Sequence, residues 1–166
     1  WNWHPYLDGL KWFLRKCWPE ISMKNKKINL VVAGPGISRE LSKHYESSNL
    51  IFPGFVKDLE KLRQEVKVFV APVFNGSGIR IKILEALASG CCIVTSKLGV
   101  LGLDVEAEKH YLRAENKEEF IKQIDRILAD KISRKQFSDY ARQYVIKNHG
   151  NDQVSNNLEA FLNRNI

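Results

Sequence analysis

The stretch around residues 69–96 constrains the fold of this chain more than any other. Two apolar runs, Val68–Ala71 and Ile93–Thr95, have the composition of buried strands. Between them lie a glycine-rich turn, Gly76–Gly78, and a helical segment, Ile79–Ser89, that Gly90 ends. The order of strand, glycine-rich turn, helix and strand predicts one βαβ unit of a parallel sheet.

The helical segment of this unit is apolar almost all round, which predicts a buried helix. At about 100° per residue its polar residues share one narrow stripe, which contains Gly78, Lys82, Glu85 and Ser89. Arg80 lies elsewhere, near the helix start. The stripe begins at the helix N-terminus, where free N–H groups and the positive end of the dipole lie.

This pattern predicts a phosphate site. Its candidate residues are the turn residues Gly76, Ser77, Gly78 and Ile79, with Lys82 adding positive charge and Glu85 accepting hydrogen bonds from sugar hydroxyls. A structural interpretation is equally open from the pattern alone. Lys82 and Glu85 are three residues apart and can pair with each other, and Gly-Ser-Gly can be an ordinary loop.

The rest of the chain alternates between short apolar runs and helical segments. Predicted strands are Ile28–Ala33, Leu50–Phe52 and a short one near Tyr111–Arg113. Predicted helices are Tyr6–Trp18 (stopped by Pro19), one capped by Ser38 and running to Tyr45, Leu59–Glu65 (capped by Asp58), Lys117–Ala129 (after Glu115 or Asn116), one capped by Ser133 and running to Lys147, and Asp152–Leu162. This alternation predicts an α/β class, a doubly wound parallel sheet of Rossmann-like type with C-terminal helices.

We expect a single domain over residues 1–150, with residues 151–166 as a C-terminal helix of the same unit. An α/β domain usually begins with a strand, so the early helix suggests a first strand upstream in a longer protein. Ligands in such sheets bind beyond the carboxyl ends of the strands. Gly34–Gly36, Gly54–Phe55 and Asn75–Gly78 follow three strands. We therefore expect these three turns to converge on one crevice.

Composition limits the remaining possibilities. The 166 residues carry a formal net charge of +7, but the basic residues are scattered, which favours solvated helix faces over a nucleic-acid site. No run of about 18 apolar residues predicts a transmembrane helix. The three cysteines, Cys17, Cys91 and Cys92, lack disulfide spacing and favour a reducing cytoplasm, and we expect them to be buried. The four histidines show no zinc spacing, so no metal site is expected.

Several segments of the chain resemble the nucleotide-sugar-binding domain of retaining GT-B glycosyltransferases, and glycosyltransferase family 4 (group 1) most closely. Besides the stretch from Pro72 to Thr95, the matching segments are Trp3–Tyr6 with Trp12–Phe13 ("W-x-P-N … W-F"), Val32–Gly34, Phe52–Val56 ("F-x-G-F-V"), Gly99–Leu103 ("G-x-x-G-L") and Ala114–Phe120. Together they cover nearly the whole chain and are much more specific than a single glycine motif.

The resemblance implies site residues and a donor. Glu85 matches the second glutamate of the family's E-x7-E motif, which implies a hydrogen bond to ribose hydroxyls. The first glutamate falls at Ser77, so the chain departs from the motif there, and the turn backbone takes over the contact to the donor sugar. Lys82 and the helix N-terminus would face the diphosphate, and Phe55 and Val56 would lie near the base. The donor would be a nucleoside diphosphate sugar, and no metal or other cofactor is implied.

The implied function is transfer of a sugar to an acceptor with retention of configuration, in polysaccharide or glycolipid synthesis. The partners would be the nucleotide sugar, an N-terminal acceptor-binding domain and, through the basic surface, the inner membrane face. These residues alone would be inactive. Alternatives are a non-enzymatic nucleotide-binding or partner module and a GT-B-like sugar-nucleotide epimerase. A dinucleotide-dependent oxidoreductase would need Gly-x-Gly-x-x-Gly, whose third glycine position holds Arg39.

Overall fold

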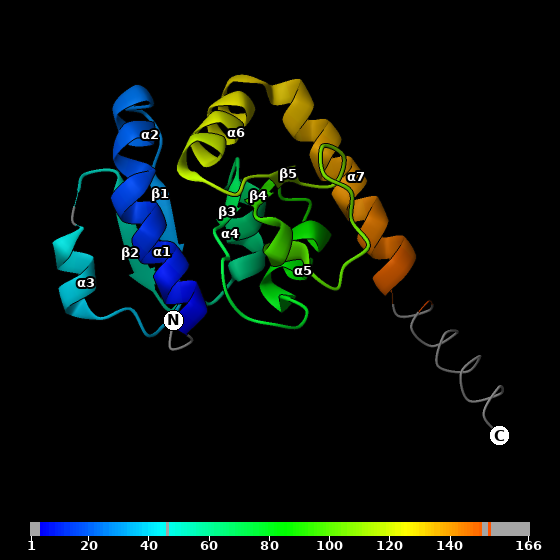
Figure 1. Ribbon diagram of the computed structural model, residues 1–166, viewed down its shortest axis with the longest axis horizontal. Helices are drawn as coiled ribbons and strands as arrows, with labels where there is room; N and C mark the ends of the chain where they lie inside the picture. The colour runs from blue at the N-terminus through cyan, green and yellow to red at the C-terminus, as the bar shows by residue number, and fades with distance from the viewer. Residues whose placement is uncertain (1–3, 46, 151–152, 154–166) are drawn as a thin grey trace.

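The computed structural model describes residues 4–45, 47–150 and 153, and Figure 1 shows how its helices and strands are arranged. Their bounds are α1 His4–Lys16, α2 Trp18–Lys24, β1 Leu30–Ala33, α3 Arg39–His44, β2 Leu50–Gly54, α4 Leu59–Glu65, β3 Phe69–Ala71, α5 Ile81–Ala88, β4 Ile93–Thr95, the 3-10 helix η1 Lys97–Val100, β5 Leu112–Arg113, α6 Lys117–Ala129 and α7 Lys131–His149. All pairings between these strands are parallel. The predicted α/β class with parallel strands is therefore confirmed.

The strands lie in two sheets. β1 pairs with β2, and β4 lies between β3 and β5. The two sheets nevertheless share one hydrophobic core, which includes Val32 of β1 and Val94 of β4. Phe13 and Leu14 of α1 belong to the same core and are almost fully buried. Among the described residues no strand of one sheet is hydrogen-bonded to a strand of the other, and α1 packs into the core that the two sheets share.

The first predicted helix is wrong at its end. We expected Pro19 to stop a helix of residues 6–18, but α1 ends at Lys16 and Pro19 lies in the first turn of a second helix, α2. A proline in the first turn loses no hydrogen bond, because the first N–H groups of a helix have no partner within it. Pro19 therefore marks a helix start, and the sequence interpretation missed α2.

Two predicted helix caps, Ser38 and Asp58, are confirmed, and Asn116, which was expected only to precede its helix, also acts as a cap. Ser38, Asp58 and Asn116 each accept a backbone N–H three residues on, at the starts of α3, α4 and α6. The predicted cap Ser133 is wrong, because the side chain of Asp130 accepts the N–H groups of Ile132 and Ser133 at the start of α7. A carboxylate is the stronger acceptor for free N–H groups.

The helix of the central βαβ unit begins later than its sequence predicts. We expected Ile79–Ser89, whereas α5 starts at Ile81 and follows an extended Arg80 with φ −90° and ψ 94°. One face of α5 is buried, with Ile83, Ala86 and Leu87 inside, whereas Ile81 is largely exposed, so the predicted burial of this helix holds for one face and not for its start. The late start keeps residues 75–80 as a turn at the end of the second sheet.

Some of the remaining expectations concern residues that the structure describes, and others concern residues outside that part of the chain. All three cysteines are free and buried, as predicted. The short strand near residues 111–113 is present as β5. The predicted helix over residues 152–162 and the resemblance at Trp3 fall outside the described residues.

Candidate functional site

The glycine-rich turn is exposed and depends on glycine at two positions. Gly76 and Gly78 have φ angles of +101° and +79°, in the left-handed region that only glycine adopts readily. A Cβ atom at Gly78 would meet no atom within 4 Å, so backbone conformation, and not crowding, requires this glycine. The turn therefore presents its backbone openly at the start of α5.

A buried arginine lies beneath the turn. The guanidinium of Arg80 donates hydrogen bonds to the carbonyl oxygens of Gly78 and, at 2.9 Å, of Gly76, and the residue is only 2% exposed. Sequence reasoning placed Arg80 away from the site. The sequence gives no sign that Arg80 is buried, because an arginine between two isoleucines normally faces solvent while the isoleucines are buried. Here the isoleucines, Ile79 and Ile81, are 51% and 67% exposed instead.

Lys82 lies in the first turn of α5, against α1. Its Nζ atom is 3.3 Å from the centroid of the Tyr6 ring. Burial lowers the pKa of Lys82 to about 8, and the nearby Glu85 carboxylate opposes this shift in part. Sequence reasoning did not include Tyr6 in the site, because nothing in the spacing of residues indicates that α1 reaches the start of α5.

Among the predicted site residues, Glu85 lies furthest along α5 from its N-terminus. Its side chain is 49% exposed and forms a salt bridge with Arg63 of α4, whose guanidinium also lies 3.6 Å from Glu60. The carboxylate is therefore at the surface and held by a fixed cation. A ligand hydroxyl can therefore reach the Glu85 carboxylate and donate a hydrogen bond to it, although Arg63 competes for the same oxygens.

Two of the three predicted turns meet directly. The N–H of Gly34 donates to the carbonyl oxygen of Gly54 over 2.8 Å, which joins the ends of β1 and β2. Phe55, just beyond, is 77% exposed, and Val56 is half-buried. The third turn ends β3 in the other sheet, and all three lie along the lower side of the molecule in Figure 1.

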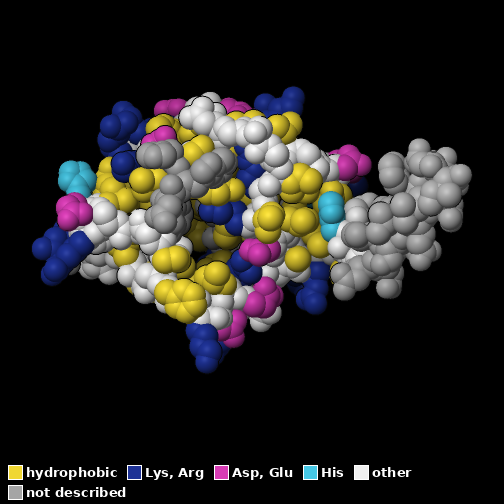
Figure 2. Space-filling view, turned by 90° about the horizontal axis from the view of Figure 1, so that it is seen from below, with side chains coloured by type: hydrophobic (Ala, Val, Ile, Leu, Met, Phe, Trp, Pro, Cys, Tyr) yellow, Lys and Arg dark blue, Asp and Glu magenta, His cyan; other side chains and the backbone are white. Residues whose placement is uncertain are grey.

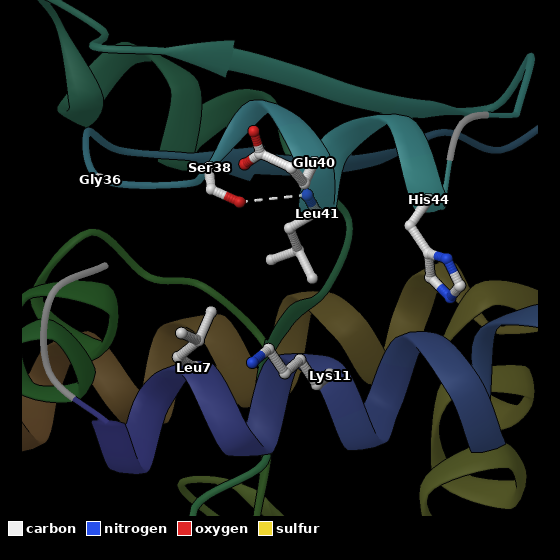
Figure 3. A pocket seen from close by; sticks show the side chains of 7 residues that line it. All are labelled: Leu7, Lys11, Gly36, Ser38, Glu40, Leu41 and His44. Atoms are coloured by element: carbon white, nitrogen blue, oxygen red, sulfur yellow. Dashed lines mark hydrogen bonds between the residues drawn. The ribbon is translucent and has the colours of Figure 1, made fainter.

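The lower face is hollowed near its centre. Figure 2 shows this face with basic side chains in and around the hollow and apolar side chains along its rim. A cavity of about 420 Å³ opens between α1 and α3 and is shown in Figure 3. Its lining residues are Leu7, Lys11, Gly36, Ser38, Glu40, Leu41 and His44. The cavity therefore adjoins the turn after β1 and carries both positive and negative groups.

The family described as "Glycosyl transferases group 1" matches residues 2–130 of this chain. The chain belongs to the group 1 glycosyltransferases. The match covers all five strands and the helices up to α6. The resemblance to group 1 glycosyltransferases is thereby confirmed.

One relative is similar along most of the chain. The "Uncharacterized 44.6 kDa protein in cps region" of Klebsiella pneumoniae is 26% identical over 160 residues, which cover 92% of this chain and 41% of that protein. This chain thus spans less than half the length of the relative.

Solved structures share the fold. The C-terminal domain of the glycosyl transferase group 1 family protein LpcC from Francisella tularensis superposes with a TM-score of 0.72 at 18% identity, covering 85% of this chain and 79% of that one. A mutant of S. aureus TarM, in a complex that contains UDP, superposes with a TM-score of 0.78 at 15% identity, covering 98% and 33%. At these identities the likeness shows the fold alone.

A metal-binding cluster or a membrane-spanning helix would each change the interpretation of the site. Among residues 4–45, 47–150 and 153, no group of three or more His, Cys, Asp or Glu side chains is placed to hold a metal ion. Within the same part of the chain, no helix combines the length and apolar character needed to cross a bilayer.

Proposed function

We propose that this group 1 glycosyltransferase chain binds the nucleoside diphosphate of a sugar donor at the Gly76–Ile79 turn and the start of α5. One observation carries the proposal. An exposed turn with two left-handed glycines is followed, within one helical turn, by a lysine that burial brings to a pKa of about 8. Such a place offers backbone N–H groups, a helix N-terminus and a positive charge to a phosphate.

The chemistry that this site supports is electrostatic. As the bond between the anomeric carbon and the diphosphate breaks, negative charge develops on the leaving oxygen. N–H dipoles and a lysine ammonium held in place stabilise that charge without having to reorganise. Removing one such donor typically raises the barrier by about 3–4 kcal/mol. The reaction we propose is sugar transfer to an acceptor with retention of configuration, and no metal ion takes part.

The rest of the donor extends away from the turn. We propose that the carboxylate of Glu85 accepts hydrogen bonds from the ribose hydroxyls, and that Phe55 and Val56 lie near the base. Ser77 stands where the E-x7-E motif has its first glutamate. The backbone of the Gly76–Ile79 turn contacts the donor sugar in its place.

The similar proteins support a nucleotide sugar and a role in surface polysaccharides. The TarM complex contains UDP, and the K. pneumoniae relative is encoded in a cps region. A uridine donor and a polysaccharide or glycolipid product are therefore our first expectation. The acceptor site lies in a further domain of a longer protein, and these 166 residues bind the donor but transfer nothing alone.

The net charge of +7 supports a second partner. We propose that the basic surface holds the whole enzyme at the cytoplasmic membrane face, where lipid-linked acceptors lie. Pelleting with vesicles that contain an anionic lipid tests this. Binding at low salt that is lost at high salt supports the contact. Equal pelleting with neutral vesicles contradicts it.

Calorimetry tests the nucleotide site. We expect UDP, GDP or ADP to bind the 166-residue chain, with UDP tightest, and uridine without phosphate to bind far more weakly. Circular dichroism on the same sample verifies the fold. A folded chain that binds none of the three diphosphates contradicts the proposal, and it favours a non-enzymatic partner module.

A further inference from the structure

Arg80 is buried where its neighbours are not. It is 2% exposed and lies between two largely exposed isoleucines, Ile79 and Ile81. Burying a guanidinium is costly unless carbonyl or carboxylate oxygens surround it. Two carbonyl oxygens of the turn meet this need, those of Gly76 and Gly78, while the Nε atom has no hydrogen-bond partner in the described part of the chain.

These two hydrogen bonds fix the direction of the turn's peptide groups. In a trans peptide the C=O and the following N–H point in opposite directions. The described residues contain no cis peptide bond. Since the carbonyls of Gly76 and Gly78 point inward to Arg80, the N–H groups of Ser77 and Ile79 point outward. Within the described residues, neither N–H has a hydrogen-bond acceptor.

Arg80 does not act as an ordinary helix cap. It occupies the N-cap position of α5, but its side chain makes no capping hydrogen bond and turns back beneath the preceding loop instead. Its charge reaches the neighbouring helix as well, because it opposes the effect of burial on the pKa of the Tyr6 phenol. The guanidinium is therefore hydrogen-bonded to the turn and also acts electrostatically on Tyr6.

We propose that Arg80 is a positioning residue for the donor diphosphate: it holds the N–H groups of Ser77 and Ile79 outward as a pair and places a positive charge beneath them. The inference rests on the proposed function of the turn. It assigns the orientation of the site to a side chain that does not touch the ligand. It also explains why α5 starts at Ile81, because a helical Arg80 would carry its guanidinium away from the two carbonyls.

The test compares two matched substitutions in the 166-residue chain. Arg80→Lys removes the two-pronged guanidinium but keeps the charge. Arg134→Lys is the control, because Arg134 likewise donates to two backbone carbonyls, those of Ile127 and Leu128, at the other end of the domain. We expect Arg80→Lys to weaken UDP binding by about tenfold or more, since two donors lose their orientation. Arg134→Lys should change stability but leave UDP affinity within about twofold of the wild type.

A wild-type measurement keeps the inference testable if Arg80→Lys does not fold. Hydrogen exchange of backbone amides should slow at Ser77 and Ile79 on adding UDP, with no change at residues of α7. Bound UDP without slowing at these two amides overturns the inference. So does a folded Arg80→Lys chain that keeps wild-type affinity, and in that case the proposed function stands. A wild-type chain that binds no nucleoside diphosphate overturns both.

Discussion

The ammonium of Lys82 rests on the ring of Tyr6, 3.3 Å from its centroid. This contact links the starts of α5 and α1. A cation loses hydration energy when it leaves water, and contact with an aromatic face offsets part of that loss. The contact with Tyr6 therefore keeps the Lys82 ammonium near the glycine turn, although burial lowers the pKa of Lys82.

Replacing this lysine should remove most of the affinity for nucleotide. We expect Lys82→Met to weaken UDP binding by about tenfold to a hundredfold, because a charge-assisted hydrogen bond contributes about 1.5–3 kcal/mol. Titration calorimetry measures the loss. Lys122→Met is the control, because Lys122 is exposed on α6, and this variant should bind UDP nearly as well as the wild type. An unchanged affinity in Lys82→Met would remove the lysine from the site.

Deprotonation of Lys82 should change UDP affinity and the free energy of unfolding in opposite directions. The pKa of Lys82 is about 8 in the folded chain and ordinarily 10.5. UDP affinity should fall as pH rises above about 8, because the ammonium loses its proton. Stability should rise between about pH 8 and 10.5, because the unfolded chain then holds the proton more tightly. Calorimetry and urea unfolding across this range test both, and Lys82→Met should flatten both relative to the wild type.

Glu85→Gln should discriminate between ligands with and without a ribose. We expect it to weaken UDP by about tenfold and to leave inorganic pyrophosphate unchanged, because only the nucleotide offers sugar hydroxyls. Glu60→Gln is a matched control, since Glu60 also lies beside Arg63 but belongs to α4. An equal loss for pyrophosphate would show that Glu85 acts through Arg63 or the fold instead of through the ribose.

His110 should make the fold less stable in mild acid. Burial, and then the charge of Lys109, lower the pKa of His110 below its usual 6.5. Its Nδ1 accepts the N–H of Glu106 at 3.0 Å, which requires the unprotonated nitrogen. As pH falls below about 6.5 the unfolded chain takes up the proton first, so stability decreases. His110→Gln should reduce this slope in urea unfolding, and a slope equal to that of the wild type would contradict the assignment.

Metal chelation should leave nucleotide binding intact. The proposed site neutralises the diphosphate with Lys82 and N–H groups, so EDTA should not change the affinity for UDP. Calorimetry with and without added magnesium is the measurement. A loss of binding in EDTA that magnesium restores would contradict the metal-independent mechanism.

Much of the fold could be predicted from local signals. Ser38 and Asp58 are followed by helical patterns, and they cap α3 and α4 as the sequence predicts. β4 matches its apolar run in both bounds, because a fully buried strand needs no polar alternation. Pro19 was misleading, since the same residue type stops one helix and starts another, and only packing against the core decides between them.

The site was less predictable than the fold. The position of the Gly76–Ile79 turn before α5, and of Lys82 within that helix, could be predicted from the sequence, because glycine spacing and a polar residue in an apolar helix are local features. Arg80 and Tyr6 were not, because their places depend on contacts made after folding. A charge between two isoleucines is expected to face solvent, and only the inward carbonyls of the turn reverse this.

The most direct test of the anion site is a titration of the isotope-labelled chain with UDP, followed by the backbone amide signals in two-dimensional NMR. The account predicts that the amides of Ser77, Gly78 and Ile79 shift most, with smaller changes at Lys82 and Glu85 and none in α7. Binding of UDP that leaves the residue 76–79 amides unmoved, or a folded chain whose spectrum does not change at all, would contradict it.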